Sequence, residues 1–234
     1  MAMTEQEKQF FRAHKFKFKG RVFYPNLLTP KANKEGTRSS FNGMFAFKPE
    51  ENQAELQKLA AFLGEAYNKF WPGFPLQNWV NPLKKFDTYR KENGQQMPDY
   101  LKGYYWINAA TGMDMPPAVV GAGVIPGTFV HLKAENGDES KIYSGKNGVF
   151  QISFYKIPRN KQGLSANIEA FMCMEGGANE GGSGGVNVED AFAGFMGATT
   201  SNMQAPTPST GAQPSWDQPA TNTTTAPKAD ISFI

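Results

Sequence analysis

The sequence has little of the chemistry on which enzymes and metal sites depend. Its 234 residues include one cysteine, Cys173, and two histidines, His14 and His131. One thiol excludes a disulfide framework, and one thiol with two imidazoles matches neither the ligand spacing of a zinc site nor a catalytic triad. The carboxylates are scattered, apart from three in the predicted turn 135–139. We therefore expect no catalytic residues, no metal site and no cofactor.

Long apolar runs are also absent. The first fifteen residues are polar, unlike a secretion signal. No later apolar run approaches the ~18 residues of a membrane span. The single thiol agrees with a reducing compartment. We expect a soluble, cytoplasmic protein.

Neither glycine-rich stretch matches a phosphate-binding motif. Residues 119–127 read VVGAGVIPG, but Pro126 interrupts the fingerprint and no helical pattern follows. Gly145, Lys146 and Asn147 lack the upstream glycine and the following Ser or Thr of a phosphate loop. We interpret residues 119–127 as a loop between strands.

Charge and composition divide the chain into two parts. Residues 1–175 contain 23 Lys and Arg against 16 Asp and Glu, whereas residues 176–234 contain one against five. The second part opens with GGANEGGSGG and continues with Pro- and Thr-rich segments that bury too little apolar surface to fold. We predict a basic domain over 1–175, with a polyanionic partner, and a flexible Gly/Pro/Thr-rich tail over 176–234.

The segment KFKFKGRVFY, residues 15–24, is the most informative stretch. Side chains alternate between the two faces of a strand, so Phe16, Phe18 and Val22 are predicted to face a core. The opposite face then presents a row of cations about 6.5 to 7 Å apart. These cations are Lys15, Lys17, Lys19 and Arg21. The pattern fits either a solvated strand face or a track for a polyanion.

The remaining periodicities predict a small, closed, all-β barrel of mostly antiparallel strands with one amphipathic helix. The helix begins near Pro49 and ends before the Pro72 break, and residues 4–12 form either a short helix or a flexible arm. Residues 25–37 are predicted to be a long polar loop. The predicted strands cover 15–24, 41–47, 104–109, 119–120, 129–132, 149–157 and 166–174.

Alternation also assigns faces to the last two strands. Phe150, Ile152 and Phe154 are predicted to point inward, which leaves Tyr155 outward. The final strand is predicted to have an apolar row. That row consists of Ile168, Ala170, Met172 and Met174.

Outward aromatic rings close to cations are the strongest functional pattern. Single-stranded nucleic acids bind where bases stack on aromatic faces and phosphates follow a basic track. Each ring taken alone fits packing equally well. The predicted stacking residues are Tyr89, Tyr104, Trp106 and Tyr155, and the predicted cationic contacts are Lys15, Lys17, Lys19, Arg21, Arg38, Lys84, Lys85 and Arg90.

Several segments resemble the single-stranded DNA-binding proteins of tailed bacteriophages. The most specific similarity runs from IYSG at 142–145 through ISFY at 152–155 to KQGLSANIEA at 161–170. FNGMFAFKPEE, at 41–51, and the EAY of the following helix are similar in arrangement to more distant members. VEDAFAGF, at 188–195, resembles the segment that closes the family's shared part. The resemblance covers most of residues 15–195.

This resemblance implies an oligonucleotide-binding (OB) barrel that binds single-stranded DNA without strong sequence preference and without catalysis. The DNA would be bound during phage replication, recombination or repair in the bacterial host cytoplasm. Two alternatives stay open. One is an RNA-binding or nucleic-acid chaperone protein with an OB fold, and the other is a structural phage protein whose aromatic faces are subunit contacts.

The C-terminal tip is a candidate site for replication or recombination proteins. The family resemblance implies an acidic and apolar tip, but this chain ends with one nearby acid, an added terminal isoleucine and the opposing charge of Lys228. A solubilising extension is the alternative interpretation. The candidate tip residues are Asp230, Ile231, Phe233 and Ile234.

Overall fold

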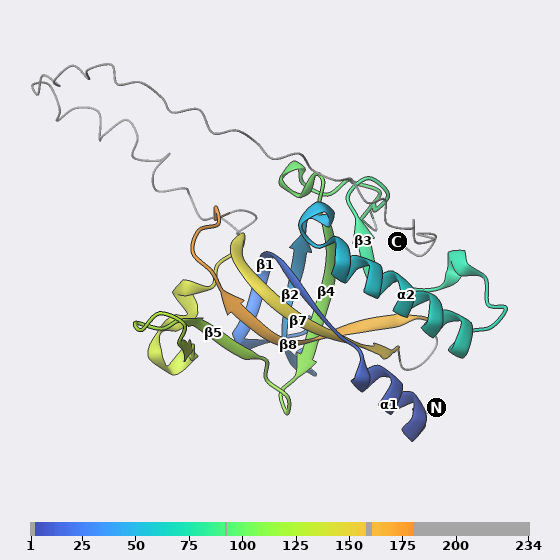
Figure 1. Cartoon of the computed structure of the whole chain (residues 1–234), viewed down its shortest axis with the longest axis horizontal. Helices are drawn as coiled ribbons and strands as arrows, with labels where there is room; N and C mark the ends of the chain where they lie inside the picture. Colours follow the sequence, from blue (N-terminus) through green and yellow to red (C-terminus); the bar gives the residue numbers. More distant parts are fainter. Residues whose placement is uncertain (1–2, 92, 158–160, 180–234) are drawn as a thin grey trace, which may run out of the picture. The chain divides into compact units, whose positions relative to one another are not determined.

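A computed structural model describes residues 3–91, 93–157 and 161–179 of the chain. This part is mostly β-structure with two α-helices (Figure 1). Neither described helix has the length and apolarity that crossing a membrane requires. The elements are α1 (Glu5–Ala13), β1 (Lys15–Ala32), β2 (Ser39–Phe47), α2 (Gln53–Phe70), β3 (Leu83–Lys85), β4 (Tyr105–Gly112), β5 (Ala118–Ala122), β6 (Phe129–His131), β7 (Lys146–Lys156) and β8 (Leu164–Cys173).

Five of the strands close into a barrel, as the sequence predicts. β1 pairs with β2 and β7, β2 pairs with β4, and β7 pairs with β8, all in antiparallel orientation. A parallel contact between Ala109 of β4 and Ala166 of β8 closes the ring. β3 extends the sheet beyond β4, and β5 and β6 extend it from β8. The loop expected over residues 119–127 is wrong for residues 119–122, which belong to β5, and only residues 123–127 lie in the connection to β6.

The alternation predicted for β1 and β7 builds the barrel interior. Phe16, Phe18 and Val22 are buried, as is the inward row of β7. Helix α2 packs Leu59, Phe62 and Leu63 against the same core. The amphipathic helix predicted from Pro49 onward is therefore confirmed, because its apolar stripe covers the inward-facing rings.

Gly20 immediately precedes Arg21, where β1 begins to pair with β2 while its pairing with β7 continues to Val22. A Cβ atom at this position would collide with the backbone carbonyl oxygen of Ala46. Only glycine permits this close approach of β1 and β2. Lys19 and Arg21 flank Gly20, and both lie on the outer face of the barrel.

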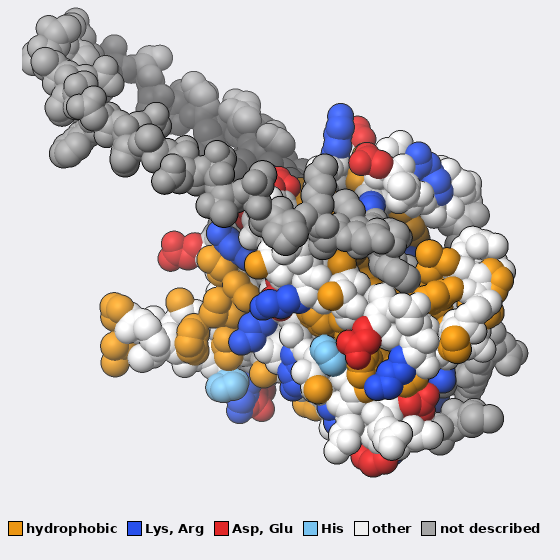
Figure 2. All heavy atoms as spheres, turned by 45° about the vertical axis from the view of Figure 1, so that its right-hand side comes forward, with side chains coloured by type: hydrophobic (Ala, Val, Ile, Leu, Met, Phe, Trp, Pro, Cys, Tyr) orange, Lys and Arg blue, Asp and Glu red, His pale blue; other side chains and the backbone are white. Residues whose placement is uncertain are grey.

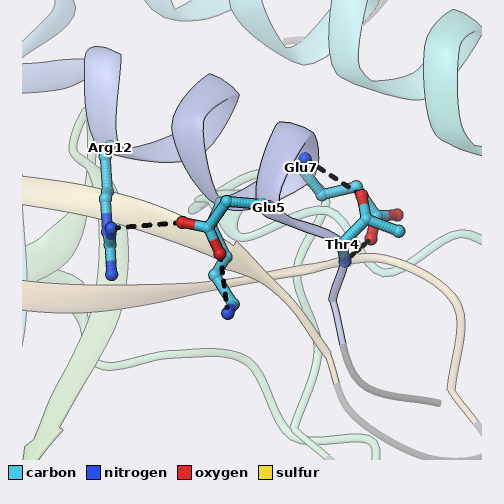
Figure 3. Close-up of polar contacts among 5 residues, drawn as sticks. Thr4, Glu5, Glu7 and Arg12 are labelled. Carbon is cyan, nitrogen blue, oxygen red and sulfur yellow. Dashed lines mark hydrogen bonds and ion pairs between the residues drawn. The ribbon is translucent and has the colours of Figure 1, made fainter.

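The N-terminal segment is a helix, one of the two alternatives that the sequence leaves open. Thr4 and Glu7 form a capping box, in which Thr4 Oγ1 accepts from the Glu7 backbone and Glu7 Oε2 accepts from the Thr4 backbone at 2.7 Å (Figure 3). Glu5 forms ion pairs with Lys8 and Arg12 on the exposed side. Glu7 also pairs with Lys156 of β7 at 3.1 Å, which ties α1 to the barrel.

The expected loop over residues 25–37 is largely wrong. β1 continues through Pro25 to Ala32 and pairs with β2 as far as Ser39. The loop was expected because this segment contains Pro and Asn residues. The strand accommodates them because its pairing with β2 is irregular, with register shifts between Phe23 and Asn26 and again after Asn26. Only residues 33–38 connect the two strands.

The inward row predicted for β8 is also wrong after Ile168. Ile152 of β7 pairs with Ile168, but its neighbour Gln151 pairs with Ala170, so β8 contains one extra residue at this point. This bulge reverses the alternation. Phe171 is therefore the buried residue, while Ala170 and Met172 are only half-buried.

Candidate nucleic-acid interface

The cations of β1 form a row on the outer face of the barrel. Lys15, Lys17 and Lys19 are exposed, and Arg21 is half-buried. The free edge of the strand is held by the start of α2, because Glu55 accepts from the Lys17 backbone at 2.8 Å and Asn52 accepts from the Lys19 backbone at 2.9 Å. The backbone of the row is thus fixed while its ammonium groups stay in solvent.

The row leads into a groove of about 350 Å³, which we call the basic groove. It brings together three residues that the sequence selects, Lys19, Arg21 and Tyr104. Lys48 adds a cation that the sequence reasoning missed, although it lies two residues after Ala46, on the outward side of the end of β2. The other lining residues are Gly20, Glu51, Asn147, Gly148, Met174 and Glu175.

Tyr104 and Lys48 provide a ring and a charge at the same place. Lys48 Nζ lies 5.8 Å from the centre of the Tyr104 ring, within the range of a cation–π contact. Tyr104 is half-buried and also packs against a hydrophobic cluster behind it. A base can stack on such a ring while the neighbouring ammonium group contacts its phosphate.

Arg21 is anchored more firmly than the lysines. Its Nε donates to the Gly145 carbonyl and its Nη2 to the Ala178 carbonyl, both at 3.0 Å. Its guanidinium carbon also lies 5.5 Å from the centre of the Phe23 ring. Contacts with the barrel therefore continue beyond residue 175, as far as Ala178. Arg21 contributes a fixed positive charge, whereas Lys19 and Lys48 can follow a ligand.

A second hydrophobic cluster covers part of the same outer face. The described residues of segment 86–103, which we call the aromatic cap, lie over Phe23, Met44 and Trp106. Trp106 faces outward from β4, opposite the inward Ile107, as predicted, yet only 1% of its surface is exposed. The expectation of an exposed Trp106 ring is wrong, because cap residues such as Phe86 and Leu101 bury it.

The cationic residues of the cap region do not form one patch. Lys84 and Lys85 are adjacent in β3 and point to opposite faces. Lys84 Nζ lies 4.7 Å from the Tyr89 ring centre, and burial lowers the pKa of its ammonium group. Lys85 Nζ lies 5.4 Å from the Tyr105 ring. Arg90 is exposed, but its Nη1 donates to carbonyls of the cap itself, at Asp87 and Tyr89.

The remaining candidates lie further from the basic groove. Lys15 forms a 2.9 Å ion pair with Glu169. Burial raises the pKa of Glu169, but hydrogen bonds from Lys15, Gln151 and Ser153 outweigh it and keep that pKa below its ordinary value. Half-buried Tyr155 lies two residues beyond Ser153, the partner of Lys15 in β7. The cationic row thus connects Tyr155 with the groove.

Arg38 is exposed in the connection between β1 and β2 and does not line the basic groove. Figure 2 shows blue basic side chains among orange apolar ones on one face of the described surface. Tyr143 is a further aromatic neighbour that the sequence reasoning missed, with Lys146 Nζ 5.2 Å from its ring. The candidate tip residues Asp230, Ile231, Phe233 and Ile234 lie outside the described residues.

The described residues contain no group of three or more His, Cys, Asp or Glu side chains placed to hold a metal ion. Within the described basic groove, the available chemistry is that of ammonium, guanidinium, phenol and amide groups, with two carboxylates at the rim. The ammonium and guanidinium groups can bind phosphates, and the phenol ring can stack on a base.

Comparison with known proteins agrees with this chemistry. In fold, the chain is similar to the single-stranded DNA-binding protein of bacteriophage Enc34 in complex with ssDNA, with 14% identity, a TM-score of 0.58 and coverage of 73% of this chain and 91% of the other. A second structure of the Enc34 protein gives 15% identity, a TM-score of 0.57 and coverage of 77% and 91%. No curated protein sequence is significantly similar. A family model, described as "Enterobacter phage Enc34, ssDNA-binding protein", matches residues 17–203, and the chain therefore belongs to this family.

Proposed function

We propose that the chain binds single-stranded DNA without strong sequence preference and protects it during phage DNA replication. The observation that carries the proposal is the basic groove on the outer face of an OB-type barrel, which is lined by Lys19, Arg21, Lys48 and the Tyr104 ring, with Lys48 beside that ring. Ammonium and guanidinium groups contact phosphates, and a phenol ring accepts any base on its face. Membership of a family described by ssDNA binding supports the same function.

The proposal assigns no catalytic step to the protein. The strand is held by charge and stacking, and the cationic row of β1 extends the contact from the groove toward Tyr155. The same binding would serve phage recombination and repair, since both processes expose single strands. The site of action would be the cytoplasm of the bacterial host.

Fluorescence anisotropy with labelled oligonucleotides of equal length tests the proposal. We expect oligo-dT to bind more tightly than duplex DNA, because stacked and paired bases cannot offer their faces to Tyr104. The three described tryptophans, Trp71, Trp79 and Trp106, are buried, so a label on the DNA reports binding better than tryptophan quenching does. Oligonucleotide that stays at full length after incubation with protein and Mg²⁺ would agree with binding alone.

Three outcomes would contradict the proposal. Equal or tighter binding of duplex DNA would show that base stacking plays no part. A strong preference for oligo-U over oligo-dT would indicate an RNA-binding protein with the same fold. Failure to bind either oligonucleotide at low salt would favour a structural phage protein.

A further inference from the structure

A β-bulge in β1 directs an aromatic ring onto the outer face of the barrel, outside the basic groove. Phe23 pairs with Met44 of β2, and Asn26 pairs with Asn42, so β1 contains one extra residue between these pairs. Strict alternation would turn Tyr24 inward, because Phe23 faces outward under the cap. Tyr24 instead adopts a left-handed conformation with φ of 51°, alone among the described non-glycine residues, and is 48% exposed.

The Tyr24 conformation is held on several sides. Its backbone N–H donates to Ser144 Oγ at 3.3 Å, and its hydroxyl lies 2.8 Å from the hydroxyl of Tyr100 in the cap. The Tyr100 ring in turn stacks on Phe23, with 5.2 Å between ring centres. Unfavourable backbone conformations that the surroundings maintain in this way concentrate at binding sites. The bulge and the cap together present the Tyr24 ring to solvent.

Beside this ring lies a hollow of about 390 Å³ on the outer face of β2 and β4. Gly43, Ala109 and Ala110 are among its lining residues, and their small or absent side chains leave room above the two strands. Asn108 is exposed at its edge, and within the described part of the chain no hydrogen bond of its side-chain amide is found. The other lining residues are Asn42, Met44 and Ser165.

We propose that this hollow is a second nucleobase subsite, in which a base stacks on Tyr24 and its edge meets the Asn108 amide. The inference rests on the proposed function, because the base would belong to the strand bound in the basic groove. Arg21 lines that groove and lies three residues before Tyr24 on β1, about 10 Å away, so one strand can reach both places. An amide offers a donor and an acceptor to a base edge, and a phenol ring offers a stacking face.

Tyr24→Gly in the full chain tests the proposal, because glycine adopts a φ of 51° without strain and keeps the bulge. We expect affinity for oligo-dT to fall roughly 5- to 150-fold, with the salt dependence unchanged. Tyr24→Phe keeps the ring and should bind like the wild type. Phe129→Ala, which removes another exposed ring from β6, is the matched control and should have no effect. Against an oligonucleotide with abasic sites, Tyr24→Gly and the wild type should bind equally.

Wild-type affinity for oligo-dT in Tyr24→Gly would overturn the subsite and leave the proposed function intact. If the wild type itself fails to bind oligo-dT, the proposed function fails and the subsite with it. If Tyr24→Gly unfolds, photocrosslinking of the wild type to an oligonucleotide containing 5-iodouracil tests the subsite instead. A crosslink to Tyr24 supports the subsite, whereas crosslinks confined to other peptides refute it. Oligo-U in place of oligo-dT shows whether the base can come from RNA.

Discussion

Tyr104 immediately precedes β4 and Trp106 is the second residue of that strand, but the two rings have different surroundings. The Tyr104 ring borders the basic groove beside Lys48. Trp106 packs beneath the aromatic cap, in a T-shaped contact with the Tyr89 ring at 5.3 Å between ring centres. A ring on the outward face of a strand is therefore a binding surface only where no other segment covers it.

This difference predicts opposite effects of two substitutions. Trp106→Ala should destabilise the protein by about 3–5 kcal/mol, because it leaves a cavity between the cap and β4. Tyr104→Ala should weaken binding of oligo-dT by about 1–3 kcal/mol and lower the melting temperature much less. Thermal melts measure the stability of both variants, and anisotropy titrations measure their affinity for oligo-dT. Tyr104→Phe is the control that keeps the ring. A folded Trp106→Ala variant with weakened binding would show that the cap opens to expose Trp106.

Helix α1 depends on the Glu7 carboxylate both for its N-terminal cap and for its attachment to β7. The hydrogen bond from the Thr4 backbone lowers the pKa of Glu7; burial acts in the opposite direction, and Lys156 lowers the pKa further. Because the folded-state pKa lies below the ordinary value of 4.5, the stabilisation is complete above that pH. It is lost as the pH falls through the folded-state pKa.

Glu7→Gln should therefore destabilise the protein at pH 7, by about 1 kcal/mol or less for a partly exposed pair. The difference from the wild type should close as the pH falls below about 4.5. Chemical denaturation at several pH values measures the difference. Glu5→Gln removes the same charge from an exposed position on α1 and is the matched control. A difference that stays constant down to pH 3 would show that the carboxylate charge of Glu7 does not contribute to the stability of the protein.

The regular parts of each element were predictable, and the irregular parts were not. Alternation identified the buried faces of β1 and β7 because apolar residues must leave water together. The bulges near Tyr24 and Ile168 have no such pattern, since each depends on the register of a partner strand distant in sequence. The sequence pattern selected Lys19, Arg21 and Tyr104, which line the basic groove. It did not predict the burial of Trp106, because the aromatic segment 86–103 fits a cap and an exposed surface equally well.

At the scale of the whole molecule, we propose that binding resides in residues 1–179 and that residues 180–234 modulate it by charge. The first part contains 23 Lys and Arg against 16 Asp and Glu, and the second contains one against five. A chain ending at Asn179 keeps Ala178, which accepts from Arg21.

This truncation should fold with nearly the same melting temperature. It should bind oligo-dT about 2- to 5-fold more tightly at low salt, with a smaller gain at high salt, because four net negative charges are removed. Anisotropy and thermal melts of the two chains measure both effects. Weaker binding or a lower melting temperature would mean that VEDAFAGF, at residues 188–195, belongs to the folded domain.

We propose that the basic groove neutralises the phosphates of a single strand. Four to five cations, from the β1 row and Lys48, predict a slope of about −3 to −3.5 for log affinity against log salt. Lys19→Gln with Lys48→Gln removes two of them, whereas Lys58→Gln with Lys133→Gln removes the same charge from exposed positions that do not line the groove.

The most direct test measures this slope for oligo-dT with the wild type and both double variants. The groove variant should lose about 1.4 from the slope, and the control variant should keep the wild-type value. Equal slopes for the two double variants, or a wild-type affinity that does not depend on salt, would show that the basic groove does not neutralise the phosphates.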